Sequence, residues 1–274
     1  MKKYSIQIDI RGGLGNQLFQ IVGSAYIAKQ LGTNLLINET ALKRHKDKSR
    51  RNWSKKLDLN SALMNLDYRW ISEPRLFNTK KNNESFLRID ESSILELKSI
   101  SQDCRFRGWF QEYRFAKAID LSNKDFNPLI LDKKDVKRAI KIEENDGLAG
   151  IHMRFGDFLS SSWGVLSASW YEHCLKNLID FGIDQFDVYS DDIPLARNTL
   201  SKIAPKLNFN FPEETSELEP NKLLWQLRHY KTFVSSNSSL SWWSSFLNVH
   251  DKPVIYSPWE KHLHVPSWKK IILR

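Results

Sequence analysis

A glycine-rich bend near the start of the chain limits most strongly what this sequence can fold into. Residues 5–10 (SIQIDI) alternate apolar and polar side chains as a strand does, and three glycines follow within residues 12–15. Apolar residues then recur at helical spacing until Gly32, and residues 34–38 (NLLIN) have the pattern of a second strand. A strand, a helix and a strand in this order predict two parallel strands joined by a right-handed crossover.

The same alternation of strands and helices returns clearly after residue 147. Strands are expected within 148–154, 185–192 and 231–237, with helices between them. We therefore predict an α/β fold with two Rossmann-like, doubly wound domains, residues 1–147 and residues 148–274, that face a cleft.

Residues 40–145 are polar, basic and irregular, so they predict fewer elements. Helices are expected around 58–66 and 134–144, and residues 106–111 (FRGWFQ) have the short aromatic pattern of a strand.

Composition excludes several classes of protein. With 41% hydrophobic and 27% charged residues among 274, the chain has the balance of a globular protein rather than a disordered one. Its two cysteines, Cys104 and Cys174, are too few and too far apart for a disulfide framework. Residues 1–13 do not have the apolar core of a signal peptide, and no apolar run approaches the roughly 20 residues of a membrane span. We therefore expect a cytoplasmic protein.

The positive charge is local. Residues 43–56 hold eight Lys or Arg and one Asp, which accounts for +7 of the formal net charge of +9. This segment could be a solvated loop, a peripheral contact with an anionic membrane on its inner face, or a site for an acidic glycan. Binding to nucleic acid is the least favoured interpretation, because no zinc-ligand or RNA-binding pattern accompanies the charge.

Four polar segments stand where predicted strands end, and in open α/β sheets ligands bind at the carboxyl ends of the strands. RGGLGNQ at 11–17 opens a helix, whose first N–H groups suit a phosphate. HMRFGD at 152–157 carries Arg154, a planar donor fork for phosphate. YSDD at 189–192 and SSNSS at 235–239 add hydroxyls and carboxylates.

Each segment also has a purely structural reading. The glycines fit neither GxGxxG nor the Walker pattern, which disfavours a nicotinamide oxidoreductase. Ser190 or Asp191 could simply cap the next helix. The DD pair lacks a D-x-D spacing, so we expect no metal site. Trp242 and Trp243 are expected to pack in the core.

Taken together and in order, the motifs GGLGNQLFQ, GWFQ, HMRFGD, YSDD and SNSSLSWW resemble the α-1,2-fucosyltransferase family, glycosyltransferase family 11. Two departures are Phe155, where the family usually has a second arginine, and Leu240, where it has an aromatic residue. The basic segment at 43–56 has no counterpart in the family pattern.

The resemblance implies a GT-B architecture, with an acceptor-side N-terminal domain and a nucleotide-sugar-binding C-terminal domain. It implies inverting, metal-independent transfer of L-fucose from GDP-fucose to the 2-hydroxyl of a galactoside in a cell-surface glycan such as O-antigen. GDP-fucose would be a substrate, and no cofactor is expected. Arg154 would contact the donor pyrophosphate. The other implied donor contacts are Gly13, Gly15, Asn16, Gln17, Ser190, Asp191, Ser236, Asn237 and Ser238.

Such a transfer needs a neutralised leaving diphosphate, a site closed to water, and a base for the acceptor hydroxyl. Arg154 and helix N-termini would supply the positive charge, and Asp157 and His152 are the candidate bases. A structural role for Asp157 beside Arg154 is an equal alternative. Another GDP-6-deoxy sugar such as GDP-colitose could replace GDP-fucose, and a basic protein that binds nucleic acid or anionic membrane is the rival from another class.

Overall fold

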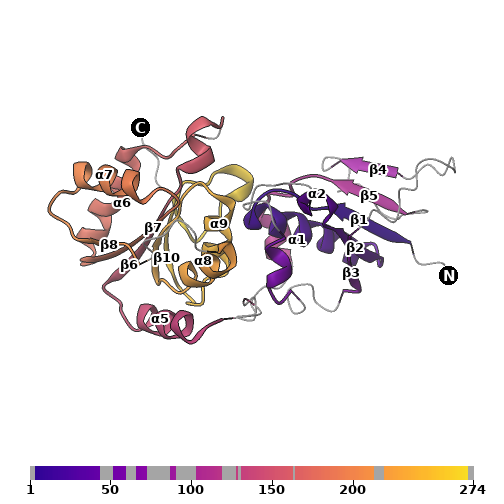
Figure 1. The fold of residues 1–274 in the computed structure, drawn as a ribbon, viewed down its shortest axis with the longest axis horizontal. Coiled ribbons are helices and arrows are strands. Elements are labelled where there is room, and N and C mark those ends of the chain that lie inside the picture. Colours follow the sequence, from indigo (N-terminus) through magenta and orange to yellow (C-terminus); the bar gives the residue numbers. More distant parts are fainter. Residues whose placement is uncertain are drawn as a thin grey trace. The chain divides into compact units, whose positions relative to one another are not determined.

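The computed structural model describes residues 4–43, 52–59, 66–72, 87–90, 103–118, 128, 131–162, 164–212 and 219–270. Contacts within the chain divide it into two compact units, Met1–Leu129 and Ile130–Arg274. Each unit contains a parallel sheet with helices packed against it (Figure 1). The prediction of two α/β sheets is confirmed.

In the part of the first unit that the structure describes, five parallel strands form one sheet in the order β3-β2-β1-β5-β4. They are β1 (Ser5–Asp9), β2 (Asn34–Asn38), β3 (Tyr68–Ile71), β4 (Leu87–Asp90) and β5 (Cys104–Arg107). The helices are α1 (Leu14–Gln30), the short α2 (Thr40–Lys43), the 3-10 turn η2 (Ser54–Lys56) and α4 (Tyr113–Ala118). The helix α1 connects β1 to β2 as predicted, and Gly32, with φ of +61°, follows its end.

The described residues of the second unit form a sheet of six parallel strands in the order β11-β10-β9-β6-β7-β8. They are β6 (Leu148–Met153), β7 (Gln185–Ser190), β8 (Phe209–Asn210), β9 (Thr232–Val234), β10 (Val254–Ser257) and β11 (Lys269–Lys270). Counted from β6, this is the 3-2-1-4-5-6 order of a dinucleotide-binding Rossmann sheet.

Helices cover both faces of this second sheet. On one face lie α6 (Ala168–Asp180) and α7 (Ile193–Ile203), and on the other lie α8 (Pro220–Leu227) and α9 (Ser239–Phe246) (Figure 1). Ser167 caps α6, because its hydroxyl accepts a hydrogen bond from the backbone N–H of Trp170. Trp242 and Trp243 of α9 are fully buried, which confirms their predicted place in the core.

The two sides of β7 are chemically different. Phe186 and Val188 belong to the apolar core with α6 and α7. Asp187 and Tyr189 face the opposite way, and both contact Arg138 of α5 (Lys133–Glu143). This alternation follows from the period of two along a strand.

The division between the units lies between Leu129 and Ile130, whereas the sequence placed it after residue 147. The difference is helix α5, which packs with the second unit. Lys222 at the start of α8 pairs with Asp132 (3.0 Å) and Asp135 (2.9 Å), the two residues that form the capping box of α5.

Two other expectations differ from the structure. Residues 106–111 are not one strand: β5 ends at Arg107, and residues 108–112 form a turn. The helix expected at 58–66 falls mostly outside the described residues, and residues 57–59 are not helical.

Replacing Gly150 by alanine should destabilise the second unit, because an added Cβ would lie 2.6 Å from Cγ of Tyr230. That ring is held in place, since its hydroxyl donates to Asp187 at 2.6 Å. Overpacking of this kind lowers the free energy of unfolding by about 1–3 kcal/mol, which urea denaturation measures. Gly147→Ala is the control, because the nearest atom would be 3.5 Å away. Equal stability of the two variants would contradict this packing.

Candidate functional site

The second sheet brings two of the predicted motifs together at its switch point. The strand order reverses between β6 and β9, which are paired neighbours. Arg154 directly follows β6, and the serine-rich turn 235–238 directly follows β9. In doubly wound sheets ligands bind at this point, outside the carboxyl ends of the strands.

Arg154 is held between two carboxylates. Its Nη1 lies 2.9 Å from Oδ2 of Asp191, and its Nη2 donates to Oδ1 of Asp157 at 2.6 Å. The ring of Phe158 lies beneath the guanidinium, 5.6 Å from Cζ to the centroid. The Asp157 side chain is 74% exposed but that of Asp191 only 20%. Asp191 is therefore a built-in support for Arg154, whereas Asp157 is a partner at the surface.

The turn after Arg154 is shaped around Asp191. The backbone N–H of Phe155 donates to Oδ1 of Asp191 at 2.9 Å. Gly156 has a φ of +22°, and an added Cβ there would lie 2.3 Å from Oδ2 of Asp191. Glycine is therefore needed for the carboxylate to reach both Phe155 and Arg154.

Several polar groups of the serine-rich turn already make hydrogen bonds within the protein. The Ser236 hydroxyl lies 3.2 Å from Nδ1 of His152, and Ser241 accepts from the backbone N–H of Ser236 at 3.0 Å. Asn237 donates to the carbonyl of Gly164 at 2.9 Å. Ser238 caps α9. Ser236 is fully buried, so Asn237 and Ser238, which are half-buried, are better placed to meet a ligand.

His152, one of the two candidate bases, is 3% exposed. Burial, together with the smaller effect of the nearby Arg154 charge, lowers the pKa of its imidazole to about 3. The side chain is therefore neutral near pH 7 and faces Ser236 inside the unit. Of the two candidates, the exposed one is Asp157.

In the YSDD segment, neither Ser190 nor Asp191 caps the next helix, contrary to the expectation. The cap of α7 is Asp192, whose Oδ1 accepts from the backbone N–H of Leu195 at 3.0 Å. Ser190 accepts from the backbone N–H of Asp192 at 3.1 Å and so supports this turn. Asp191 is thereby left to hold Arg154.

The first unit has a second switch point, between β1 and β5. The glycine bend follows β1, and Gly12 has a φ of +78°. Gly13 is the N-cap of α1, and as a glycine it makes no side-chain cap hydrogen bond. The first turn of α1 therefore presents backbone N–H groups and no acidic residue, as an anion site requires. Gly15 is buried in this turn, and Asn16 is half-buried.

Gln17, which the resemblance places among the donor contacts, is held inside the first unit. It is fully buried, donates to the carbonyl of Gly12 at 2.9 Å, and accepts from the Ser54 hydroxyl at 3.0 Å. Gln17 thus fastens the bend to the end of the basic segment.

The basic segment is only partly described. Residues 44–51 lie outside the described residues, so a membrane contact there stays a prediction. The end of the segment is not a solvated loop: Ser54 is fully buried, and Lys55 pairs with Glu39 (3.6 Å).

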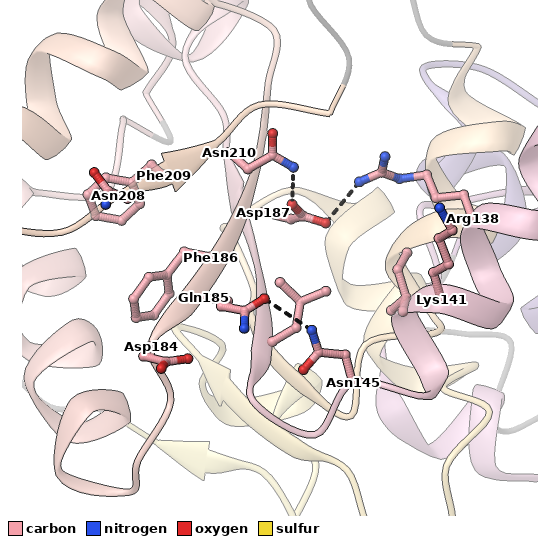
Figure 2. Close-up of a pocket in the computed structure, with 12 residues that line it drawn as sticks. Arg138, Lys141, Asn145, Asp184, Gln185, Phe186, Asp187, Asn208, Phe209 and Asn210 are labelled. Atoms are coloured by element: carbon pink, nitrogen blue, oxygen red, sulfur yellow. Dashed lines mark hydrogen bonds and ion pairs between the residues drawn. The ribbon is translucent and has the colours of Figure 1, made fainter.

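Sequence reasoning missed a polar network around Asp187, at one side of a cavity of about 650 Å³ (Figure 2). Asp187 accepts from Arg138 (2.8 Å), from Tyr230 (2.6 Å) and from Asn210. Burial comes first among the causes that raise the pKa values of Tyr230 and Tyr189, which keeps both hydroxyls protonated as donors. The sequence feature that could have indicated this network is Asp187 itself, an aspartate between the apolar residues Phe186 and Val188 of a strand.

This cavity is not the predicted donor site. It is lined by residues such as Leu148 and Asp184, at or before the amino ends of β6 and β7, whereas Arg154 follows the carboxyl end of β6. The residues drawn in Figure 2 come from α5 and the turn after it, from the start of β6, and from β7 and β8 with the residues just before them.

Within the described ranges, no three His, Cys, Asp or Glu side chains gather as metal ligands would. No described helix has the length and apolar character that crossing a bilayer would need.

Known proteins resemble this chain over most of its length, although no family model matches it. It is 24% identical over 284 residues to WbnK of Escherichia coli, an O-antigen biosynthesis glycosyltransferase, which covers 91% of this chain and 92% of the relative. It is 23% identical over 274 residues to an alpha-1,2-colitosyltransferase of Escherichia coli, which covers 91% and 89%.

Solved structures share the fold. POFUT1 in complex with GDP superimposes with a TM-score of 0.54 at 13% identity, over 90% of this chain and 95% of that one. NodZ, an alpha-1,6-fucosyltransferase co-crystallised with GDP, gives 0.55 at 12% identity, over 90% and 93%. These neighbours confirm the predicted GT-B-like fold. Together with the two sequence relatives, they support a glycosyltransferase.

Lowering the pH from about 6.5 towards 3 should destabilise the protein through His152. Its pKa is about 3 when folded but about 6.5 when unfolded, so the unfolded chain alone binds a proton in this window. As the pH is lowered through this window, the free energy of unfolding decreases by up to about 1.4 kcal/mol per pH unit because of this group. Urea denaturation at several pH values measures the slope.

His152→Gln is the comparison variant, because it removes this titration and should flatten the slope. His229 contributes with the same sign in both proteins, since burial lowers its pKa to about 4. Identical slopes for the two proteins would contradict the assignment of a buried neutral imidazole at position 152.

Proposed function

We propose that this protein is an inverting, metal-independent glycosyltransferase that moves L-fucose from GDP-fucose to the 2-hydroxyl of a galactoside. The acceptor would be a cell-surface glycan such as O-antigen. The observation that carries the proposal is that Arg154 and the serine-rich turn follow two adjacent strands, β6 and β9, at the switch point of a sheet with the Rossmann strand order. The relatives named above and the GDP-bound structural neighbours support the donor class.

Arg154 is suited to a leaving diphosphate. When the glycosidic bond to the donor breaks, negative charge grows on the phosphate oxygens, and a preorganised cation there stabilises the transition state. Asp191 fixes the guanidinium from one side through Nη1, at 2.9 Å. The remaining N–H groups of the fork can then donate to phosphate oxygens. No metal has a part in this proposal, and loss of turnover in a chelator would contradict it.

Asp157 would compete with the donor phosphate for the guanidinium of Arg154. Two carboxylates surround one guanidinium, so an incoming diphosphate must replace the more exposed one, Asp157, at Nη2. Once displaced, this carboxylate is available to accept the proton of an acceptor hydroxyl. Asp157 would therefore pair with Arg154 while no donor is bound, and it would act as the base once the donor is bound.

GDP-colitose is the second candidate donor, because one relative is named an alpha-1,2-colitosyltransferase. Contacts to the diphosphate do not distinguish the two sugars. Product analysis with each donor and a galactoside acceptor separates them: fucosylated product supports the first candidate, and exclusive transfer of colitose supports the second.

Arg154→Ala should reduce turnover on the order of 10²-fold or more, because it removes one charge-stabilising donor. Arg154→Lys should recover only part of the loss, since lysine keeps the charge but not the planar fork. The assay measures kcat with GDP-fucose and the affinity for GDP by calorimetry.

Arg197→Ala is the matched control. Arg197 is an exposed arginine of the same unit that lies over the ring of Phe211 (4.0 Å), in the helix α7. Its loss should leave kcat and GDP affinity unchanged. Full activity of a folded Arg154→Ala protein would refute the role of Arg154.

Asp157→Asn should change binding and turnover in opposite directions. Removing the competing charge should tighten GDP binding several-fold, whereas loss of the base should lower kcat by roughly 10²-fold. Calorimetry with GDP and steady-state kinetics give the two values. Weaker GDP binding would instead mean that Asp157 only positions Arg154.

A further inference from the structure

The turn after β5 carries an exposed indole. Trp109 is 40% exposed, and among the described residues of the first unit no other large apolar side chain is as exposed. It follows β5 by two residues, so it lies at the carboxyl end of the sheet. Since β5 pairs with β1, Trp109 belongs to the same switch point as the glycine bend.

The backbone of this turn is strained in a way that separates two neighbouring aromatic residues. Phe110 has a φ of +54°, a conformation that bulky residues rarely adopt. Its side chain is fully buried against Gly23, where an added Cβ would lie 2.5 Å from Cβ of Phe110, and beside the ring of Phe115. The chain therefore holds Phe110 inward while Trp109 stays at the surface, and such strain persists mainly where function requires it.

Two contacts fix the turn to the glycine bend. The guanidinium of Arg11 lies over the Trp109 ring, 4.2 Å from Cζ to the centroid. Gln111 donates to Oδ1 of Asn16 at 2.8 Å. Gln20 in turn holds the backbone of Arg11, accepting from its N–H (3.2 Å) and donating to its carbonyl (2.9 Å). The exposed indole is thus preorganised beside half-buried polar side chains.

We propose that Trp109 is the platform on which a pyranose ring of the acceptor stacks, with Arg11 as its polar partner. A galactoside presents one face of C–H groups, whose partial positive charge is attracted to the π face of an aromatic ring. The N–H groups of Arg11 can donate to sugar hydroxyls. Because Arg11 already orients the indole, binding loses little side-chain entropy. The inference rests on the proposed function and adds the acceptor-binding residues to it.

The test is steady-state kinetics with lactose as the acceptor and GDP-fucose as the donor. Trp109→Ala should raise KM for lactose by roughly tenfold, which corresponds to about 1.4 kcal/mol of binding. KM for GDP-fucose and the affinity for GDP should stay within about twofold. Trp109→Phe keeps an aromatic face and should recover most of the acceptor binding. An unchanged KM for lactose, or an equal loss of GDP affinity, would overturn the proposal.

Phe181→Ala is the matched control. Phe181 is 68% exposed and also carries a cation over its ring, Lys269 at 4.1 Å, but it belongs to the other unit and precedes the amino end of β7. Its loss should leave both KM values unchanged, and a rise in KM for lactose as large as that of Trp109→Ala would overturn the proposal.

A donor-free measurement separates this proposal from the proposed function. Saturation-transfer NMR with lactose alone should show contact in the wild type and in Phe181→Ala, but not in Trp109→Ala. If the wild type binds lactose through Trp109 yet does not bind GDP, the donor proposal fails and the platform stands. If lactose contact persists in Trp109→Ala, the platform fails whatever GDP does.

Discussion

The ion pair between Arg154 and Asp191 is the interaction on which the candidate site depends. Asp191 uses one oxygen for the guanidinium and the other for the backbone N–H of Phe155, so the side chain and the turn are fixed by the same carboxylate. Gly156 allows that carboxylate to approach. A charge held in this way loses little entropy when it meets a ligand, which is what transition-state stabilisation by a single arginine requires.

Parallel sheets explain why motifs far apart in the sequence belong together. In the second unit the switch point joins the ends of β6 and β9, which brings residues 154–157 and 235–238 to one edge. In the first unit the ends of β1 and β5 bring the glycine bend beside Trp109. Each unit therefore gathers its polar motifs by the same rule, although the two strand orders differ.

Sequence patterns predicted the elements that alternate regularly, because burial on a sheet or one helical face imposes a period. They also predicted that Arg154 and the serine-rich turn lie at the ends of strands, since both follow segments with such a period. They could not predict the burial of Gln17 and His152, which depends on partners distant in sequence, Ser54 and Ser236. Nor did they predict the short strands β3 and β4, because residues 40–103 lack a clear period, or the network of Asp187, which only tertiary packing satisfies.

The central claim is that the diphosphate of a guanine nucleotide binds at Arg154 in place of Asp157. A crystal structure of the protein with GDP tests it most directly. We predict phosphate oxygens about 2.7–2.9 Å from the guanidinium nitrogens, with Asp191 still paired to Arg154 and Asp157 turned away. A complex in which Arg154 keeps both carboxylates, while GDP is bound elsewhere in the second unit, would contradict the account.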